Sequence, residues 1–421
     1  MIHVLTNPVY RRLFLAQVVA LAGTGLATVA LGLLAFDLAG ESAGQVLGTA
    51  LAIKMVAYVF VAPLAAALVV RWPRRAVMIG ADVVRLAIAL CLPFVGEIWQ
   101  VYVLIFALQA ASATFTPTFQ SVVPDVLEDE GEYTTALSLS RLAYDLEAVL
   151  SPMLAALLLI FIPFAALFFG TAAGFAASAL LVAATALPKR ADAEDAAGAP
   201  GPEVPFGRRA RRGIELFVRT PALRPVLALN LAVASAGAFV LVQTVVIVRT
   251  TFAQGDGVVA LLLAANGAGS MAAAFALPRL LRTVSERRAM LTGAVLLSIT
   301  MFLVPLVLQV STVGWGLGLL AVAWALVGLG WSAVETPVGR IIRRNVGGPE
   351  LPAAFAAQFS LSHACWLITY PLAGWLGGSG LGRAALVLAV VATFATGVAA
   401  RLWRPAATPG DRSVPISATV P

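Results

Sequence analysis

Charged residues are scarce in this sequence. Of its 421 residues, 12% are charged and 60% are hydrophobic, and the mean hydropathy is +0.94. Globular proteins carry about 25% charged and 45–50% apolar residues, so the composition excludes an ordinary soluble domain. Lysine is nearly absent: the sequence has 26 arginines but only two lysines, Lys54 and Lys189.

Cysteine and histidine are equally rare. Cys91 and Cys365 both lie in apolar runs, so they predict neither a disulfide framework nor a metal site. His3 and His363 are too few and too far apart for a metal cluster. The chain has no phosphate-binding Gly-x-x-x-x-Gly-Lys loop and no nucleophile elbow with a triad. We therefore expect no enzymatic activity, no ATP-driven step and no cofactor.

Long apolar runs fill most of the chain. A transmembrane helix needs about 20 mostly apolar residues, and twelve runs satisfy this length. They are continuous rather than alternating, which indicates helices and not barrel strands. The expected spans are 13–36, 44–70, 76–95, 101–123, 134–161, 163–187, 223–248, 257–282, 288–310, 314–338, 352–378 and 382–402.

The basic residues are distributed unequally between the two sides of these spans. Twenty-four lysines and arginines fall in the terminal segments and in alternate loops, whereas only Arg249 and Arg383 fall on the other side. Cytoplasmic loops carry such an excess, so both termini are expected in the cytoplasm of a bacterial cell. The net charge of +7 then reflects topology and contact with anionic lipids rather than binding of nucleic acid.

A polar segment divides the chain into two halves that resemble each other. Residues 192–203 have the composition of a linker, and Phe206–Arg219 is a basic segment expected to lie on the membrane as an amphipathic helix. The octapeptides 74–81 and 287–294 share five of eight residues. We expect an amino-terminal half (1–187), a cytoplasmic linker (188–222), a carboxy-terminal half (223–402) and a disordered cytoplasmic tail (403–421).

The segment 63–75, Pro-Leu-Ala-Ala-Ala-Leu-Val-Val-Arg-Trp-Pro-Arg-Arg, resembles the loop 2–3 signature of the major facilitator superfamily. Arg71, Arg74 and Arg75 occupy the basic positions of that signature, but Val70 stands where the family has an aspartate. The resemblance implies an all-α fold of two parallel six-helix repeats around a central cavity. It also implies a gate at the cytoplasmic end, in which Asp82 could replace the missing acid.

Helix 5 resembles a second signature, that of exporters in the same superfamily. The family's glycine, Gly-Pro and Gly-Gly positions fall on Glu147, Ser151, Pro152, Ala155 and Ala156, where four of the five are small or proline. The overall sequence pattern resembles that of the bacterial drug and siderophore exporters, a branch of the superfamily whose members exchange their substrate for protons. Export of an amphipathic small molecule is thus implied by the resemblance.

Asp145 and Glu147 place two acids in this apolar helix. Asp145 lies four residues after Arg141, so the two can pair near the cytoplasmic surface. Glu147 lies roughly 200° around the helix from Asp145 and faces elsewhere. Because burial favours a neutral carboxyl, Glu147 is our first candidate for the coupled proton and Asp145 the second. Pairing of Glu147 with another helix is the alternative.

Other charged residues are candidates for the gate. Asp82 and Arg85 are three residues apart and are expected to pair with each other or with loop 4–5. Glu335 precedes Pro337 at the inner end of helix 10 and could gate against Arg340 or Arg343. With Arg71, Arg74, Arg75 and Arg141, these residues complete the predicted gate.

Polar and aromatic residues inside the spans are candidates for substrate contact. Lys54 lies too deep for simple snorkelling and could bind an anionic group or pair with an acid. His363 titrates near neutral pH, although a structural, hydrogen-bonded histidine is the commoner case. Trp331 shares a helix face with Trp324, and the pair could stack on a flat ligand or simply pack. The uncharged candidates are Gln17, Gln109, Asn230 and Gln243.

The expected protein is a monomeric secondary transporter whose partners are a small molecule, protons and membrane lipids, without nucleic acid or metal. Uptake of a solute, with Lys54 binding an anionic group, is the main alternative. A sensor or lipid scramblase built on the same fold is a further one, because fold does not determine function.

Overall fold

The computed structural model describes residues 2–61, 72–127, 129–186, 214–347 and 350–403. These residues are almost entirely helical, and no strand occurs among them. Nine stretches are long and apolar enough to cross a membrane. The first of these, Pro8–Val61, contains two successive helices, and α6 and α14 are two further long helices. They are consistent with the twelve predicted spans, of which 44–70 lies partly outside the described residues.

The first group of helices follows the predicted spans closely. It comprises η1 (Ile2–Thr6), α1 (Pro8–Ala39), η2 (Gly40–Ser42), α2 (Ala43–Val56), the π-helical segment η3 (Ala57–Val61), α4 (Arg74–Cys91), η4 (Leu92–Phe94), α5 (Ile98–Val126), α6 (Glu130–Leu158) and α7 (Phe164–Ala183).

The second group follows a short helical turn at 214–219. It comprises α9 (Arg224–Val246), the π-helical segment η5 (Ile247–Thr251), α10 (Asp256–Leu280), α11 (Glu286–Val307), α12 (Val313–Glu335), α13 (Val338–Asn345), α14 (Leu351–Gly378) and α15 (Leu381–Leu402). Of the predicted amphipathic segment, 206–213 lies outside the described residues, and Phe217 is fully buried against the core.

Polar residues fix where several helices begin. The Asn7 side chain accepts hydrogen bonds from the backbone amides of Val9 and Tyr10, at 3.0 and 3.2 Å, and Pro8 occupies the first helical position of α1. Asp129 accepts from the amide of Glu132 at 2.9 Å at the start of α6. Such caps satisfy amides that have no partner within the helix, and here they stand outside the apolar spans.

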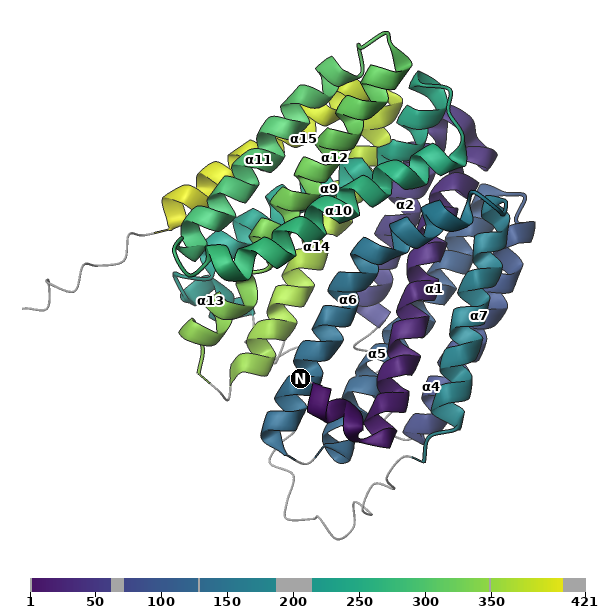
Figure 1. Ribbon diagram of the computed structural model, residues 1–421, viewed down its shortest axis with the longest axis vertical. Coiled ribbons are helices and arrows are strands. Elements are labelled where there is room, and N and C mark those ends of the chain that lie inside the picture. The colour runs from purple at the N-terminus through teal and green to yellow at the C-terminus, as the bar shows by residue number, and fades with distance from the viewer. Residues whose placement is uncertain (1, 62–71, 128, 187–213, 348–349, 404–421) are drawn as a thin grey trace, which may run out of the picture.

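Corresponding helices pack in the same way in the two groups. α1 packs on α7 as α9 packs on α15, and α4 packs on α5 and α7 as α11 packs on α12 and α15. Figure 1 shows the two groups side by side, the first in purple and blue and the second in green and yellow. This arrangement is the predicted pair of parallel six-helix repeats.

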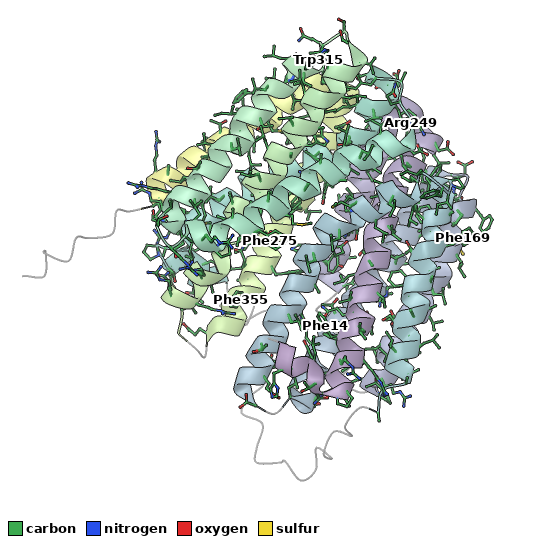
Figure 2. The ribbon with its side chains drawn as sticks, in the orientation of Figure 1. Phe14, Phe169, Arg249, Phe275, Trp315 and Phe355 are labelled. Carbon is green, nitrogen blue, oxygen red and sulfur yellow. The ribbon has the colours of Figure 1, made fainter. Side chains whose placement is uncertain are left out.

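The outer surface is apolar, as contact with lipid requires. Phe169, Phe275 and Trp315 are exposed on different helices, as Figure 2 shows. Glycines allow close crossings inside: a Cβ built on Gly328 of α12 would lie 1.8 Å from the backbone oxygen of Asn266 in α10. Small residues at such crossings are typical of membrane helix packing, which has no hydrophobic driving force between helices.

The two groups meet mainly where α2 packs on α14 and α6 packs on α10, with smaller contacts of α9 on α1 and α2. At the end of the bundle that carries the α1–α2 connection, the contact is backbone to backbone. A Cβ on Gly374 would lie 2.3 Å from the backbone oxygen of Gly44, and a Cβ on Gly48 would lie 2.6 Å from that of Tyr370. We call this contact the seal. At the opposite end, the ribbons of α13 and α14 diverge from α6 and η1 (Figure 1).

Candidate functional site

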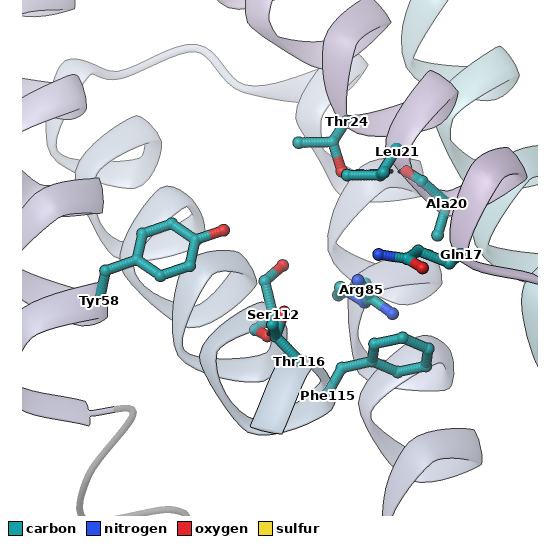
Figure 3. A pocket seen from close by; sticks show the side chains of 9 residues that line it. All are labelled: Gln17, Ala20, Leu21, Thr24, Tyr58, Arg85, Ser112, Phe115 and Thr116. Atoms are coloured by element: carbon teal, nitrogen blue, oxygen red, sulfur yellow. Dashed lines mark hydrogen bonds between the residues drawn. The ribbon is translucent and has the colours of Figure 1, made fainter. Parts of the chain in front are cut away.

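A pocket lies within the first group, near the middle of its helices. It is lined by residues of α1, η3, α4 and α5. Figure 3 shows Gln17 and Arg85 on one side, the Tyr58 hydroxyl pointing in from the other, and Ser112 and Thr116 between them. Polar side chains from four helical elements therefore converge inside an apolar bundle.

Arg85 is the charged group of this pocket. Its guanidinium is paired with the Asp82 carboxylate, which also accepts a hydrogen bond from Ser178 of α7 at 2.7 Å. The guanidinium carbon also lies 4.4 Å from the ring centre of Phe115 and 4.6 Å from that of Phe175. Asp82 and Arg85 are 0% and 4% exposed, so the predicted pairing is present and it fixes Arg85 deep in the membrane-spanning region.

Gln17 completes the polar wall of the pocket on α1. Its amide oxygen accepts a hydrogen bond from the Ser140 hydroxyl of α6 at 3.0 Å. Gln109 lies on the same face of α5 as Ser112 and is 4% exposed. Its amide oxygen has no hydrogen-bond partner among the described residues. Both glutamines were predicted as substrate contacts, and that role stays a prediction.

Glu147 lies beside a tight crossing of α6 and α1. A Cβ built on Gly25 would lie 2.0 Å from the Ser151 hydroxyl oxygen and 2.8 Å from the Glu147 carboxylate. The side chains of Ser151 and Glu147 therefore occupy space that a Cβ at position 25 would fill. The carboxylate also interacts electrostatically with the Lys54 ammonium of α2. Both side chains are half-buried, and each has an opposite charge on another helix within electrostatic reach.

Several predicted gate residues fall where the structure gives no side-chain description. Arg71 lies outside the described residues, and so do the side chains of Arg141 and Asp145. The proposed Arg141–Asp145 pair and the cluster of Arg71, Asp82 and Arg141 accordingly stay predictions.

The remaining basic residues of the predicted gate have partners within the first group. Arg74 pairs with Asp125 at the end of α5, and Arg75 donates a hydrogen bond to the backbone oxygen of Ala183 at the end of α7. These contacts tie α4 to its two neighbours at the end of the bundle opposite the seal. Asp125 was not among the predicted residues, although its position after Pro124 at a helix end resembles that of an interfacial acid.

In the second group, Glu286 is the acid that pairs with the basic residues after helix 10. Arg340 and Arg344 of α13 lie 3.6 and 2.9 Å from its carboxylate. Glu335, predicted to gate with Arg340 or Arg343, lies near enough to Cys365 of α14 for an electrostatic interaction. The gate role of Glu335 stays a prediction.

Two of the uncharged candidates in α9 are engaged with α14. Asn230 and Gln358 exchange two hydrogen bonds, at 3.3 and 3.1 Å, and both are buried. Gln243 donates to the backbone oxygen of Ala373 at 2.7 Å. A Cβ on Gly44 of the first group would lie 2.6 Å from the same amide nitrogen. Gln243 therefore belongs to the seal, while Asn230 joins two helices of one group.

The aromatic candidates form two clusters. Trp331 packs on Trp366 at 5.0 Å, and Gly237 leaves room for both rings. Trp324 is fully buried and donates its indole N–H to Thr244 at 2.7 Å, so it does not share the surroundings of Trp331.

His363 belongs to a cluster that spans the two groups. It stacks on Phe359 at 3.9 Å, and its ring lies 5.9 Å from that of Tyr58. Because Tyr58 also lines the pocket, this cluster joins the pocket to the second group.

The comparisons with known proteins agree with this architecture. Residues 13–320, more than half of the chain, match the sequence model of the Major Facilitator Superfamily. The chain belongs to the major facilitator superfamily. It is thus a multi-pass secondary transporter rather than an enzyme. No curated protein sequence matches the chain.

Solved structures with the same fold cover nearly the whole of this superfamily member. A mutant of the nucleoside transporter NupG has a TM-score of 0.73 and 12% identity, over 94% of this chain and 100% of its own. A bacterial homologue of the human lysosomal transporter Spinster, in an inward-facing and unoccupied conformation, has a TM-score of 0.70 and 12% identity, over 94% and 98%. A POT family transporter in complex with a thioalcohol-conjugated peptide has a TM-score of 0.66 and 12% identity, over 94% and 97%. At these identities the similarity shows the fold alone.

Proposed function

We propose that this transporter exports an amphipathic small molecule in exchange for protons, and that Glu147 carries the coupled proton. The observation that carries the proposal is the placement of Glu147 and Lys54. Their side chains interact electrostatically, and they lie on α6 and α2, which pack against α10 and α14 of the second group. Ionisable groups inside a membrane are costly and usually mark an ion or substrate pathway.

The surroundings of Glu147 change with the relative position of the two groups. α2 and α6 hold α14 and α10 in the present state, so rocking of one group against the other alters water access along both helices. A carboxyl is charged where water reaches it and neutral where hydrocarbon surrounds it. Alternation between these states binds a proton on one side of the membrane and releases it on the other.

The helix 5 pattern and the predicted topology support the proposed direction of transport. The α1–α6 crossing at Gly25 and Ser151 is the close approach that the exporter-like pattern of small residues permits. With both termini in the cytoplasm, the seal lies on the outer side and the diverging helix ends on the inner side. This is the state in which an exporter collects its substrate.

Glu147→Gln tests the coupling. Glutamine keeps the size of the side chain beside Gly25 but carries no proton. The probe is a compound to which overexpression of the transporter confers resistance. In inverted vesicles with an imposed proton gradient, we expect Glu147→Gln to abolish uphill accumulation of this probe while retaining binding and downhill exchange.

The controls separate coupling from structure. Glu41→Gln alters an exposed acid of η2 and should transport as the wild type does. Glu147→Gln combined with Lys54→Met removes both charges and should restore any stability lost with the single change, but not uphill transport. Asp145→Asn should instead lower accumulation and exchange together. Uphill transport by Glu147→Gln with the wild-type pH dependence would place the proton elsewhere, and accumulation in the opposite direction would favour uptake.

A further inference from the structure

The serine and threonine hydroxyls of the pocket present acceptors rather than donors. Ser112 donates its proton to the backbone oxygen of Leu108 at 3.0 Å, Thr116 donates to that of Ser112 at 3.2 Å, and Thr24 donates to that of Ala20 at 3.0 Å. A hydroxyl has one proton and two lone pairs. Because each proton is held by the helix itself, the oxygens offer lone pairs to a ligand.

The opposite wall of the pocket presents donors. A guanidinium carries five N–H groups and no acceptor, and Arg85 is held in place by Asp82 and by the rings of Phe115 and Phe175. The oxygen of Gln17 accepts from Ser140, so its amide nitrogen is the end that faces the pocket, as Figure 3 shows. The pocket thus has a donor side on α1 and α4 and an acceptor side on α5.

Among the residues that line the pocket, the one charged group, Arg85, already has a counter-charge. Asp82 neutralises Arg85 within one helix, so an anionic ligand would gain little from a guanidinium that is already paired. A cation would be repelled by the N–H donors on that side of the pocket. The rest of the lining, including Leu21 and the Phe115 ring, is apolar. A neutral polar group on an apolar body fits this lining best.

We propose that the pocket binds a neutral amphipathic molecule through an amide-type group, in which a carbonyl stands beside an N–H. The carbonyl oxygen accepts from Arg85 and Gln17, and the N–H, or a neighbouring hydroxyl, donates to Ser112 and Thr116. This inference rests on the proposed transport function, since the ligand is the transported molecule.

The test uses binding by the purified full-length protein in nanodiscs, without a proton gradient. The probes are two neutral molecules with amide or imide groups, chloramphenicol and cycloheximide, and two without: the cation tetraphenylphosphonium and the anion deoxycholate. We expect the neutral pair to bind more tightly than the charged pair. Failure of both neutral probes to bind, or tighter binding of a charged probe, would overturn the assignment.

The variant that assigns the pocket is Ser112→Ala, and Ser298→Ala is its matched control. Both serines are 5% exposed and donate to the carbonyl four residues earlier at 3.0 Å, but Ser298 lies in α11. Loss of one neutral hydrogen bond should weaken binding of the neutral probes by about 2- to 12-fold in Ser112→Ala, with no change in Ser298→Ala. Arg85 is left intact, because its removal would leave Asp82 buried without its partner.

The outcome is independent of the coupling mechanism. Glu147→Gln should still bind the neutral probes. If Ser112→Ala binds them as tightly as Ser298→Ala does, the pocket is not their site, even where Glu147→Gln loses uphill transport. If instead Ser112→Ala weakens binding while Glu147→Gln still transports uphill, the pocket stands and the coupling proposal fails.

Discussion

Gly374→Ala should shift this transporter away from the state described here. Gly374 lies on α14 at the seal, where α14 meets α2 of the other group. A Cβ at this position would lie 2.3 Å from the oxygen of Gly44, 3.1 Å from its carbonyl carbon and 3.3 Å from the Cα of Gln45. All three are backbone atoms, so the clash cannot be relieved by a change of side-chain rotamer.

The size of the effect follows from the geometry. An ordinary contact needs about 3.4 Å, so the two helices must separate by roughly 1 Å at this point. Overpacking of this kind costs about 1–3 kcal/mol. The cost falls only on the state in which the seal is closed, because the two groups separate there when that end opens. A difference of 1–3 kcal/mol changes the ratio of the two states by about 5- to 150-fold.

Electron spin resonance distances between the two groups measure this shift. Spin labels at Glu41 and Ser311, in a chain whose two native cysteines are replaced by serine, report on the sealed end from opposite sides. Gly374→Ala should enlarge the population with the longer distance. Gly397→Ala is the control, since a Cβ there meets no atom within 4 Å.

The reasoning is refuted if Gly374→Ala leaves the distance distribution unchanged while the protein remains folded. An equal shift in Gly397→Ala would also refute it, since the effect would then come from the general preference of helices for alanine over glycine.

Three further predictions concern topology and buried polar groups. A cysteine at Glu41 should react with an impermeant maleimide from outside intact cells and one at Ala197 should not; the reverse pattern would contradict the predicted orientation. Asp82→Asn leaves the Arg85 guanidinium without its counter-charge and should cost about 3–5 kcal/mol, seen as a lower melting temperature in detergent; an unchanged melting temperature would show that the pair is not stabilising. A double-mutant cycle with Asn230→Leu and Gln358→Leu should give a coupling energy of about 0.6–1.7 kcal/mol, whereas additive losses would show that the two amides act independently.

The helices were predictable because hydrocarbon imposes a strict rule. Every backbone polar group must be satisfied within its own segment, so apolar runs of sufficient length become helices with little dependence on their neighbours. The expected spans 257–282 and 382–402 became α10 (Asp256–Leu280) and α15 (Leu381–Leu402). The two groups were predictable from the echo between 74–81 and 287–294, which opens α4 and α11.

The partners of the polar residues were only partly predictable. Asp82 and Arg85 are three residues apart, so their pairing follows from helix geometry. Gln243 was expected to contact substrate, but its amide donates to Ala373, a contact that depends on how closely α9 approaches α14. The interaction of Glu147 with Lys54 depends likewise on how α6 and α2 are placed around α1, on which both pack.

The pocket itself had a weak signal in the sequence. Ser112 and Thr116 are four residues apart on one face of α5, and Gln109 precedes them on that face. A run of small hydroxyl residues in an apolar helix is common, however, because such hydroxyls can bond to their own helix. Only the position of Arg85 opposite this face distinguishes them as pocket residues.

Proton release on substrate binding tests the central claim most directly. The measurement adds chloramphenicol, or any compound shown to bind, to the purified transporter in weakly buffered solution near neutral pH and records the change in proton concentration. If Glu147 exchanges its proton for substrate, the wild type should release up to about one proton per bound molecule, and the release should fall away at high pH, where Glu147 is already ionised. Glu147→Gln should bind the same compound and release none. Equal proton release by the wild type and Glu147→Gln would contradict the account.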